Sequence, residues 1–72
     1  MIVVSLPQKR EEVKEYIDKL CVENITYKVI DEKNIDLLVE CDMDDEEFAR
    51  KQLKKEIKRF VGTMIYFGIR VQ

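Results

Sequence analysis

The sequence predicts an α+β domain, covering residues 1–72, in which two helices lie on one face of a four-stranded antiparallel sheet. Two patterns carry this prediction. Apolar and polar residues alternate in four short segments, which is typical of strands with one buried face. In two longer segments apolar residues recur every three or four positions, which is typical of amphipathic helices. The segments follow one another as strand, helix, strand, strand, helix, strand.

The clearest strand covers residues 35–42, and we expect it in the middle of the sheet. Every second residue from Ile35 to Cys41 is apolar, and the residues between them are acidic apart from Leu38. One face of this strand is therefore expected to meet the core and the other to meet water. Leu38 is the apolar exception on the wet face.

A hairpin is expected to join this strand to the one before it, residues 25–31. A three-residue loop, 32–34, pairs Val29 with Leu37 and directs the apolar side chains of both strands to the core. Such loops commonly end in a left-handed residue, a conformation that Asn34 tolerates well. The register and the turn chemistry agree.

The first strand is expected at residues 2–6 and the first helix at about residues 7–22. Ser5 and Gln8 have the spacing of a capping box, and Pro7 is tolerated in a first helical turn. The apolar stripe of this helix consists of Val13, Ile17, Leu20 and Cys21.

The second helix is expected to begin at Asp44, which has capping-box spacing to Glu47, and to end at Gly62. The last strand then covers residues 63–71, where aliphatic and aromatic residues alternate with others. The apolar stripe of the second helix consists of Ala49, Leu53, Ile57 and Phe60.

The order βαββαβ, with right-handed crossovers, places the first and third strands in the middle of the sheet. The strand order is then 4-1-3-2. Two helices on one face of such a sheet resemble the ferredoxin-like fold. This fold hosts many unrelated functions, so the function has to be argued from individual residues.

The composition argues against several classes of function. The net charge is −2, so the protein as a whole does not attract nucleic acid or an anionic membrane. No apolar run is long enough to span a bilayer, and no signal peptide is visible. Cys21 and Cys41 are expected as buried, reduced thiols in the cytoplasm, although a disulfide between them stays open.

Catalysis is not expected, because no histidine is present to act as a base or to activate a thiol. No cofactor and no metal ion are expected. An acidic cluster precedes the second helix, but it lacks the glycine and the final glutamate of a calcium loop. These acidic residues fit a helix start better than a cation site. The cluster consists of Asp42, Asp44, Asp45, Glu46 and Glu47.

The leading hypothesis is a small non-enzymatic domain that binds protein, most simply a second copy of itself. The last strand lies at an edge of the predicted sheet, and its run from Met64 to Ile69 has no charge and no proline, with only Arg70 near the end; such an edge invites pairing with another chain. The open sheet face is expected to carry an apolar patch, and such patches mark interfaces. The expected contact residues are Val3, Leu38, Met64, Tyr66 and Arg70.

The alternative is a module that binds a small ligand or nucleic acid through the basic face of the second helix. Glu46 and Glu47 precede basic residues by four positions, so salt bridges within the helix explain this face as well. No aromatic residue is interleaved with the lysines on that face. The residues of the basic face are Lys51, Lys54, Lys55 and Lys58.

Overall fold

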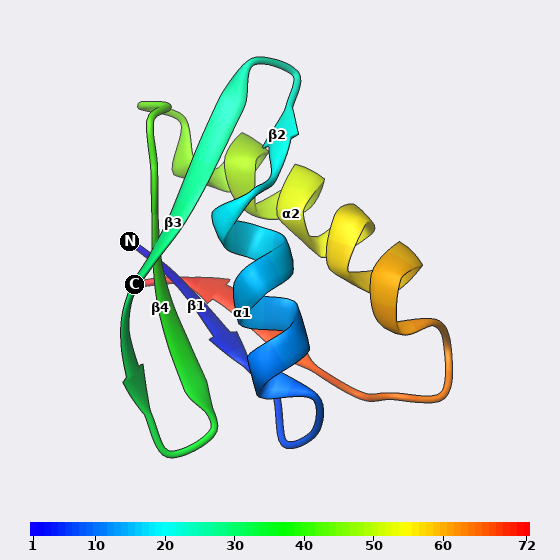
Figure 1. Cartoon of the computed structure of the whole chain (residues 1–72). Helices are drawn as coiled ribbons and strands as arrows, with labels where there is room; N and C mark the ends of the chain where they lie inside the picture. Colours follow the sequence, from blue (N-terminus) through cyan, green and yellow to red (C-terminus); the bar gives the residue numbers. More distant parts are fainter.

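The computed structural model describes residues 1–72 and confirms the α+β class, with two helices and five strands (Figure 1). The predicted number of strands was one too low, because a short strand forms between the first helix and the hairpin. Neither helix is long and apolar enough to cross a membrane. In chain order the elements are β1 (Ile2–Ser5), α1 (Arg10–Asp18), β2 (Cys21–Val22), β3 (Ile25–Lys33), β4 (Asp36–Cys41), α2 (Glu46–Val61) and β5 (Gly68–Val71).

The five strands form one curled antiparallel sheet in the order β2-β3-β4-β1-β5 (Figure 1). The four longer strands follow the expected order, and the additional strand β2 extends the sheet beyond β3. Both helices lie on one face, with α1 against β3 and α2 against β5. The other face of the sheet carries no helix.

The hydrophobic core lies between the sheet and the helices. Tyr27 lies at the end of the core near the start of α2, where its hydroxyl donates to the carbonyl oxygen of Ala49 at 2.8 Å. Burial raises the pKa of Tyr27 to about 12, and nearby acidic groups add to the shift. The buried cluster consists of Ile2, Val4, Leu6, Val13, Ile17, Ile25, Tyr27, Leu37, Val39, Ala49, Leu53 and Ile57.

The hairpin between β3 and β4 has the predicted faces but not the predicted register. Its loop contains two residues, 34–35, and the first of them is left-handed with a φ of 53°. A bulge at Ile30 shifts the pairing, so that Val29 lies opposite Val39 instead of Leu37. A two-residue loop alone would have turned the apolar side chains outward. The extra residue in β3 restores their direction.

Helix α1 begins at Arg10, later than predicted. The capping residue is Lys9, with a φ of 59° and no side-chain hydrogen bond, and Ser5 does not cap the helix. Ser5 is instead the last residue of β1, where it pairs with Asp36 of β4. The helix also ends earlier, at Asp18, so the prediction of a helix as far as residue 22 was wrong.

The short strand β2 occupies the end of the predicted helix. A two-residue turn follows it, in which Glu23 and Asn24 both have positive φ, as tight hairpins require. Val22 then lies opposite Ile25 of β3. Cys21 is exposed in this strand, so the prediction that it is buried was wrong.

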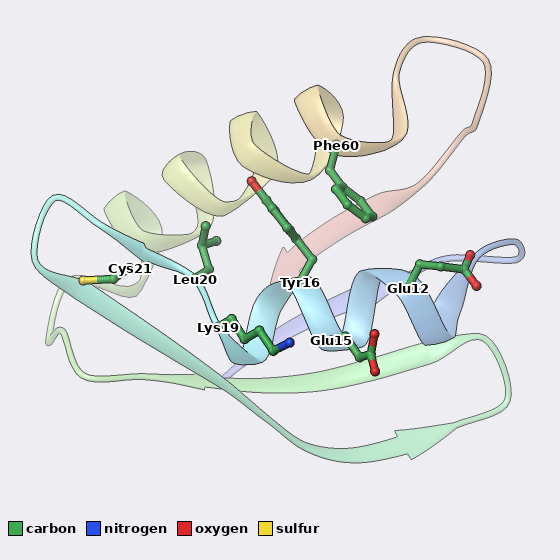
Figure 2. Close-up of a pocket in the computed structure, with 7 residues that line it drawn as sticks. All are labelled: Glu12, Glu15, Tyr16, Lys19, Leu20, Cys21 and Phe60. Carbon is green, nitrogen blue, oxygen red and sulfur yellow. The ribbon is translucent and has the colours of Figure 1, made fainter.

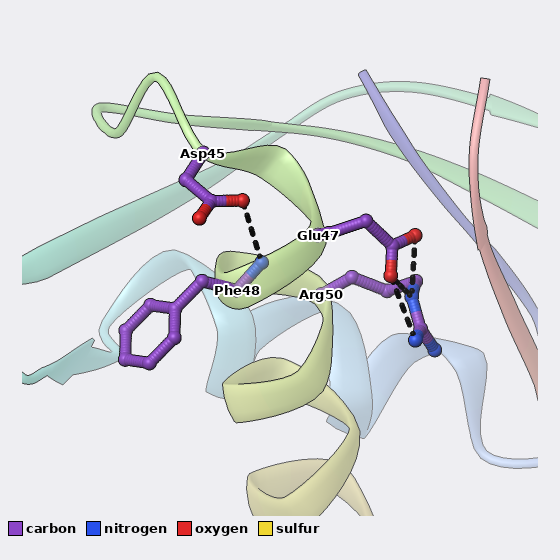
Figure 3. Close-up of polar contacts among 4 residues, drawn as sticks. All are labelled: Asp45, Glu47, Phe48 and Arg50. Carbon is purple, nitrogen blue, oxygen red and sulfur yellow. Dashed lines mark hydrogen bonds and ion pairs between the residues drawn. The ribbon is translucent and has the colours of Figure 1, made fainter.

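Helix α2 is capped one residue later than predicted. The carboxylate of Asp45, not Asp44, accepts a hydrogen bond from the backbone N–H of Phe48 at 3.1 Å (Figure 3). At the other end, Gly62 has a φ of 83°, and its N–H donates to the carbonyl oxygen of Lys58 at 2.8 Å. The predicted stop at Gly62 is confirmed.

Candidate functional site

The expected apolar patch on the open sheet face does not form. Val3 is only 1% exposed, although it points away from the helices, because its strand lies between two others. Leu38 and Arg70 lie opposite it on the two sides, and Leu38 is half-buried. Little apolar surface therefore reaches water at the middle of this face.

Met64 and Tyr66 lie outside the sheet. The predicted strand was too long at its start, because β5 begins only at Gly68. Residues 62–67 form an irregular segment that leads from the end of α2 back to the sheet (Figure 1). In this segment Met64 is 90% exposed and Tyr66 is 89% exposed. They do not continue the surface of Val3.

A polar cluster occupies the open face beside β5. The hydroxyl of Ser5 donates to Asp36 Oδ1 at 2.5 Å, and Arg70 Nη1 donates to Ser5 Oγ at 3.2 Å. Arg70 Nη2 also lies 3.8 Å from Asp36 Oδ2. The charge of Arg70 is thus partly balanced within its own chain.

The outer edge of β5 is free. The N–H of Gln72 donates to the carbonyl oxygen of Met1. In an antiparallel pair these bonds recur at every second residue, so the N–H and C=O groups of Arg70 and Gly68 also point towards β1. The residues between them, Ile69 and Val71, therefore direct their N–H and C=O groups away from the sheet. The predicted edge position of the last strand is confirmed.

The largest groove lies between the two helices and β2 and has a volume of about 540 Å³ (Figure 2). Tyr16 and Phe60 stack across it, with ring centroids 4.4 Å apart. The hydroxyl of Tyr16 donates to Glu56 at 3.0 Å, and burial together with this carboxylate raises the pKa of Tyr16. The remaining lining residues are Glu12, Glu15, Lys19, Leu20 and Cys21.

The groove is lined by two aromatic rings, a thiol, two carboxylates and a lysine. Its rings are already stacked on one another, and the thiol of Cys21 has no histidine near it because the chain contains none. No three His, Cys, Asp or Glu side chains lie together in a way that could hold a metal ion. The acidic residues before α2 are likewise not gathered into such a group.

The basic face of α2 is exposed and largely unpaired. Glu47 binds Arg50, with a shortest distance of 3.1 Å (Figure 3). No ion pair joins Glu47 to Lys51. Arg59 is paired with Glu56 at 3.6 Å. The lysines of this face have no carboxylate oxygen within 4.0 Å, so the expected salt bridges do not neutralise them. They are Lys51, Lys54, Lys55 and Lys58.

A second groove, of about 260 Å³, lies between the end of α2 and residues 62–67. Two lysines of the basic face, Lys54 and Lys58, line it together with Tyr66 and Phe67. The aromatic residue that the basic face of the helix lacks is therefore supplied by the segment that follows it. No helical spacing in the sequence could show this, because the segment reverses direction after Gly62.

Comparison of the chain with protein-family models, with curated proteins and with solved structures found no match. The function is therefore argued from the molecule itself. Two features carry that argument: the free edge of β5 and the groove at the end of α2.

Proposed function

We propose that this protein is a small non-enzymatic interaction domain that forms a homodimer through the outer edge of β5. The observation that carries the proposal is the pair of outward-facing backbone positions, Ile69 and Val71, on an edge strand whose one charged residue is Arg70. Unpaired edge groups are a template for strand addition. A second copy supplies a strand of matching length by two-fold symmetry.

The other edge of the sheet explains why β5 is the favoured side. There, β2 covers the start of β3, and Asp18 accepts a hydrogen bond from the N–H of Val29 at 2.9 Å. Lys28 and Lys33 add charge along the same strand. Natural edges are protected in these ways, and β5 lacks such protection apart from Arg70.

Pairing two β5 strands around a two-fold axis joins Ile69 of each copy with Val71 of the other. Four backbone hydrogen bonds result, because each of these residues contributes one N–H and one C=O. The same pairing brings the partially buried side chain of Ile69, with Phe67 beside it, next to the second copy. Additional apolar burial of this kind also helps a chain with a small core.

This register places Arg70 opposite its counterpart in the second copy. Two like charges in that position oppose pairing. The contacts of Arg70 with Ser5 and Asp36 reduce this repulsion, since each copy carries its own balancing carboxylate.

Sedimentation equilibrium over a wide concentration range tests the proposal. We expect the parent to dimerise and Val71→Pro to be monomeric, because proline removes an N–H that bonds only across the interface. Val71→Ala is the matched control: it shortens the side chain, keeps the N–H and should still dimerise. Circular dichroism verifies that both variants fold. A monomeric parent, or a Val71→Pro variant that dimerises like the parent, refutes the proposal.

We also propose the ferredoxin-like fold and the cytoplasmic location that the sequence predicts. The order of the four longer strands and the two helices on one face support a ferredoxin-like arrangement to which β2 has been added. The two free cysteines, Cys21 and Cys41, are consistent with the reducing cytoplasm.

A further inference from the structure

The groove at the end of α2 combines positive charge with an exposed aromatic ring. Gly62, with its positive φ, turns the chain so that residues 63–67 pass beside the last turns of the helix. Tyr66 then lines the same groove as Lys54 and Lys58. These three side chains come from two segments of the chain.

The two lysines are not neutralised within the molecule. Lys58 lies in the last turn of α2, where a positive charge complements the helix dipole, but Lys54 lies a full turn earlier. Neither ammonium group has a carboxylate within 4.0 Å. An anion that entered the groove would meet two free positive charges.

Tyr66 supplies a planar surface beside these charges. It is 89% exposed and its hydroxyl makes no hydrogen bond to the protein, so the ring is available for stacking. From this arrangement we infer that the groove binds a nucleotide, with its phosphate on Lys54 and Lys58 and its base on Tyr66. Lysine binds phosphate as a point charge, and bases stack on aromatic side chains.

The groove volume of about 260 Å³ lies slightly below the usual range of ligand sites, about 300–1,000 Å³, so a nucleotide bound there would stay partly in solvent. Two kinds of ligand carry such a phosphate and base: a free nucleotide and a single-stranded nucleic acid. The four lysines of the basic face fall within an arc of about 100° around α2, so a longer strand would continue from the groove towards Lys51. This inference does not depend on dimerisation through β5.

Calorimetric titration at low salt tests the inference. The probes are adenosine monophosphate, inorganic phosphate and a short single-stranded oligoadenylate. We expect the monophosphate to bind, and Tyr66→Ala to weaken its binding roughly tenfold through lost stacking. Lys58→Gln should weaken it by a similar factor through the lost charged contact. Lys51→Gln is the matched control on the same helix and should leave monophosphate binding unchanged.

The oligoadenylate separates the two kinds of ligand. If it binds more tightly than the monophosphate, and Lys51→Gln weakens only the oligonucleotide, the ligand is a nucleic acid strand. Equal affinities point to a free nucleotide. The inference is overturned if the monophosphate does not bind, if inorganic phosphate binds as tightly and Tyr66→Ala has no effect, or if Lys51→Gln matches Lys58→Gln.

Discussion

The backbone N–H of Val29 donates to the carboxylate of Asp18 at 2.9 Å, and this bond protects one edge of the sheet. Asp18 is the last residue of α1, where a negative charge is unfavourable for the helix dipole. Asp18 is favoured there by its hydrogen bond to the edge of β3, which the end of α1 covers. The edge of β5 has no comparable partner.

Replacement of Asp18 should therefore affect the strand edge more than the stability. In Asp18→Ala the lost hydrogen bond, about 1 kcal/mol, is offset by the removal of a charge worth about 0.5 kcal/mol at the helix end. We expect faster hydrogen exchange at the Val29 amide with a change in unfolding free energy below about 1 kcal/mol. Asp18→Asn keeps an acceptor and should retain slow exchange. Unchanged exchange in Asp18→Ala would contradict the assigned bond.

The cap of α2 gives a second prediction. Asp45→Ala should lower the free energy of unfolding by about 1 kcal/mol, because the N–H of Phe48 loses its acceptor. Asp44→Ala is the control and should cost much less, since its carboxylate caps nothing. Urea denaturation measures both. A larger loss in Asp44→Ala would place the cap where the sequence pattern predicted it.

Tyr27 predicts a loss of stability at alkaline pH. Its pKa is about 12 in the folded chain, whereas a tyrosine in the unfolded chain has the ordinary pKa of 10.0, so the unfolded chain releases the proton first. The stabilisation is fully present below pH 10 and is lost as the pH rises towards 12. Tyr27→Phe should be less stable at neutral pH, through the lost bond to Ala49, and should show a smaller decline above pH 10.

The matched control for this titration is Tyr66→Phe. Tyr66 is almost fully exposed, so its replacement should leave the alkaline decline as steep as in the parent. Thermal unfolding followed at several pH values between 8 and 12 provides the measurement. Equal slopes for Tyr27→Phe and the parent would show that burial of Tyr27 does not govern this decline.

Asp36 tests the proposed dimer through its charge. Asp36→Asn keeps an acceptor for Ser5 but leaves Arg70 without its balancing carboxylate. Repulsion across the two-fold axis should then weaken dimerisation several-fold at low salt, and added salt should restore it. Glu40→Gln removes a charge from the same strand away from Arg70 and should have little effect. A dimer that is insensitive to Asp36→Asn would exclude the register centred on Arg70.

The hairpin shows what a sequence pattern can and cannot determine. Alternation reports only which residues share a face, so Val29 and Val39 were correctly placed on the core side. A three-residue loop and a two-residue loop with one bulge give the same alternation. Ile30 carries no mark of its bulge, and the pattern therefore led to the wrong register and placed Ile35 in the strand.

The same limit applies to the last strand. Residues 63–67 alternate as a strand does, yet they have to connect the end of α2 with the sheet edge. That connection leaves Met64 and Tyr66 in irregular structure. The N-cap of α2 was misplaced for a related reason. Asp44 and Asp45 are neighbours of the same residue type, so the sequence alone does not show which of them caps the helix.

The candidate site was only partly visible in the sequence. The lysines of α2 could be placed on one exposed face from helical spacing alone. Their neighbour Tyr66 could not, because it follows the helix after a reversal at Gly62. The middle position of the first strand was predicted, but alternation did not show that Leu38 and Arg70, which lie opposite Val3 on the two neighbouring strands, leave it buried.

The bulge at Ile30 makes the hairpin tip a place where the length of the chain can change. Removing this residue would leave a regular ladder with unchanged faces, because Val29 would still lie opposite Val39 and Asp31 opposite Leu38. Glu32 would stay opposite Leu37 and would keep its ion pairs with Arg10 and Lys14 of α1. Deletion of residue 30 should thus be tolerated, and a peptide tag could be carried in the loop at residues 34–35.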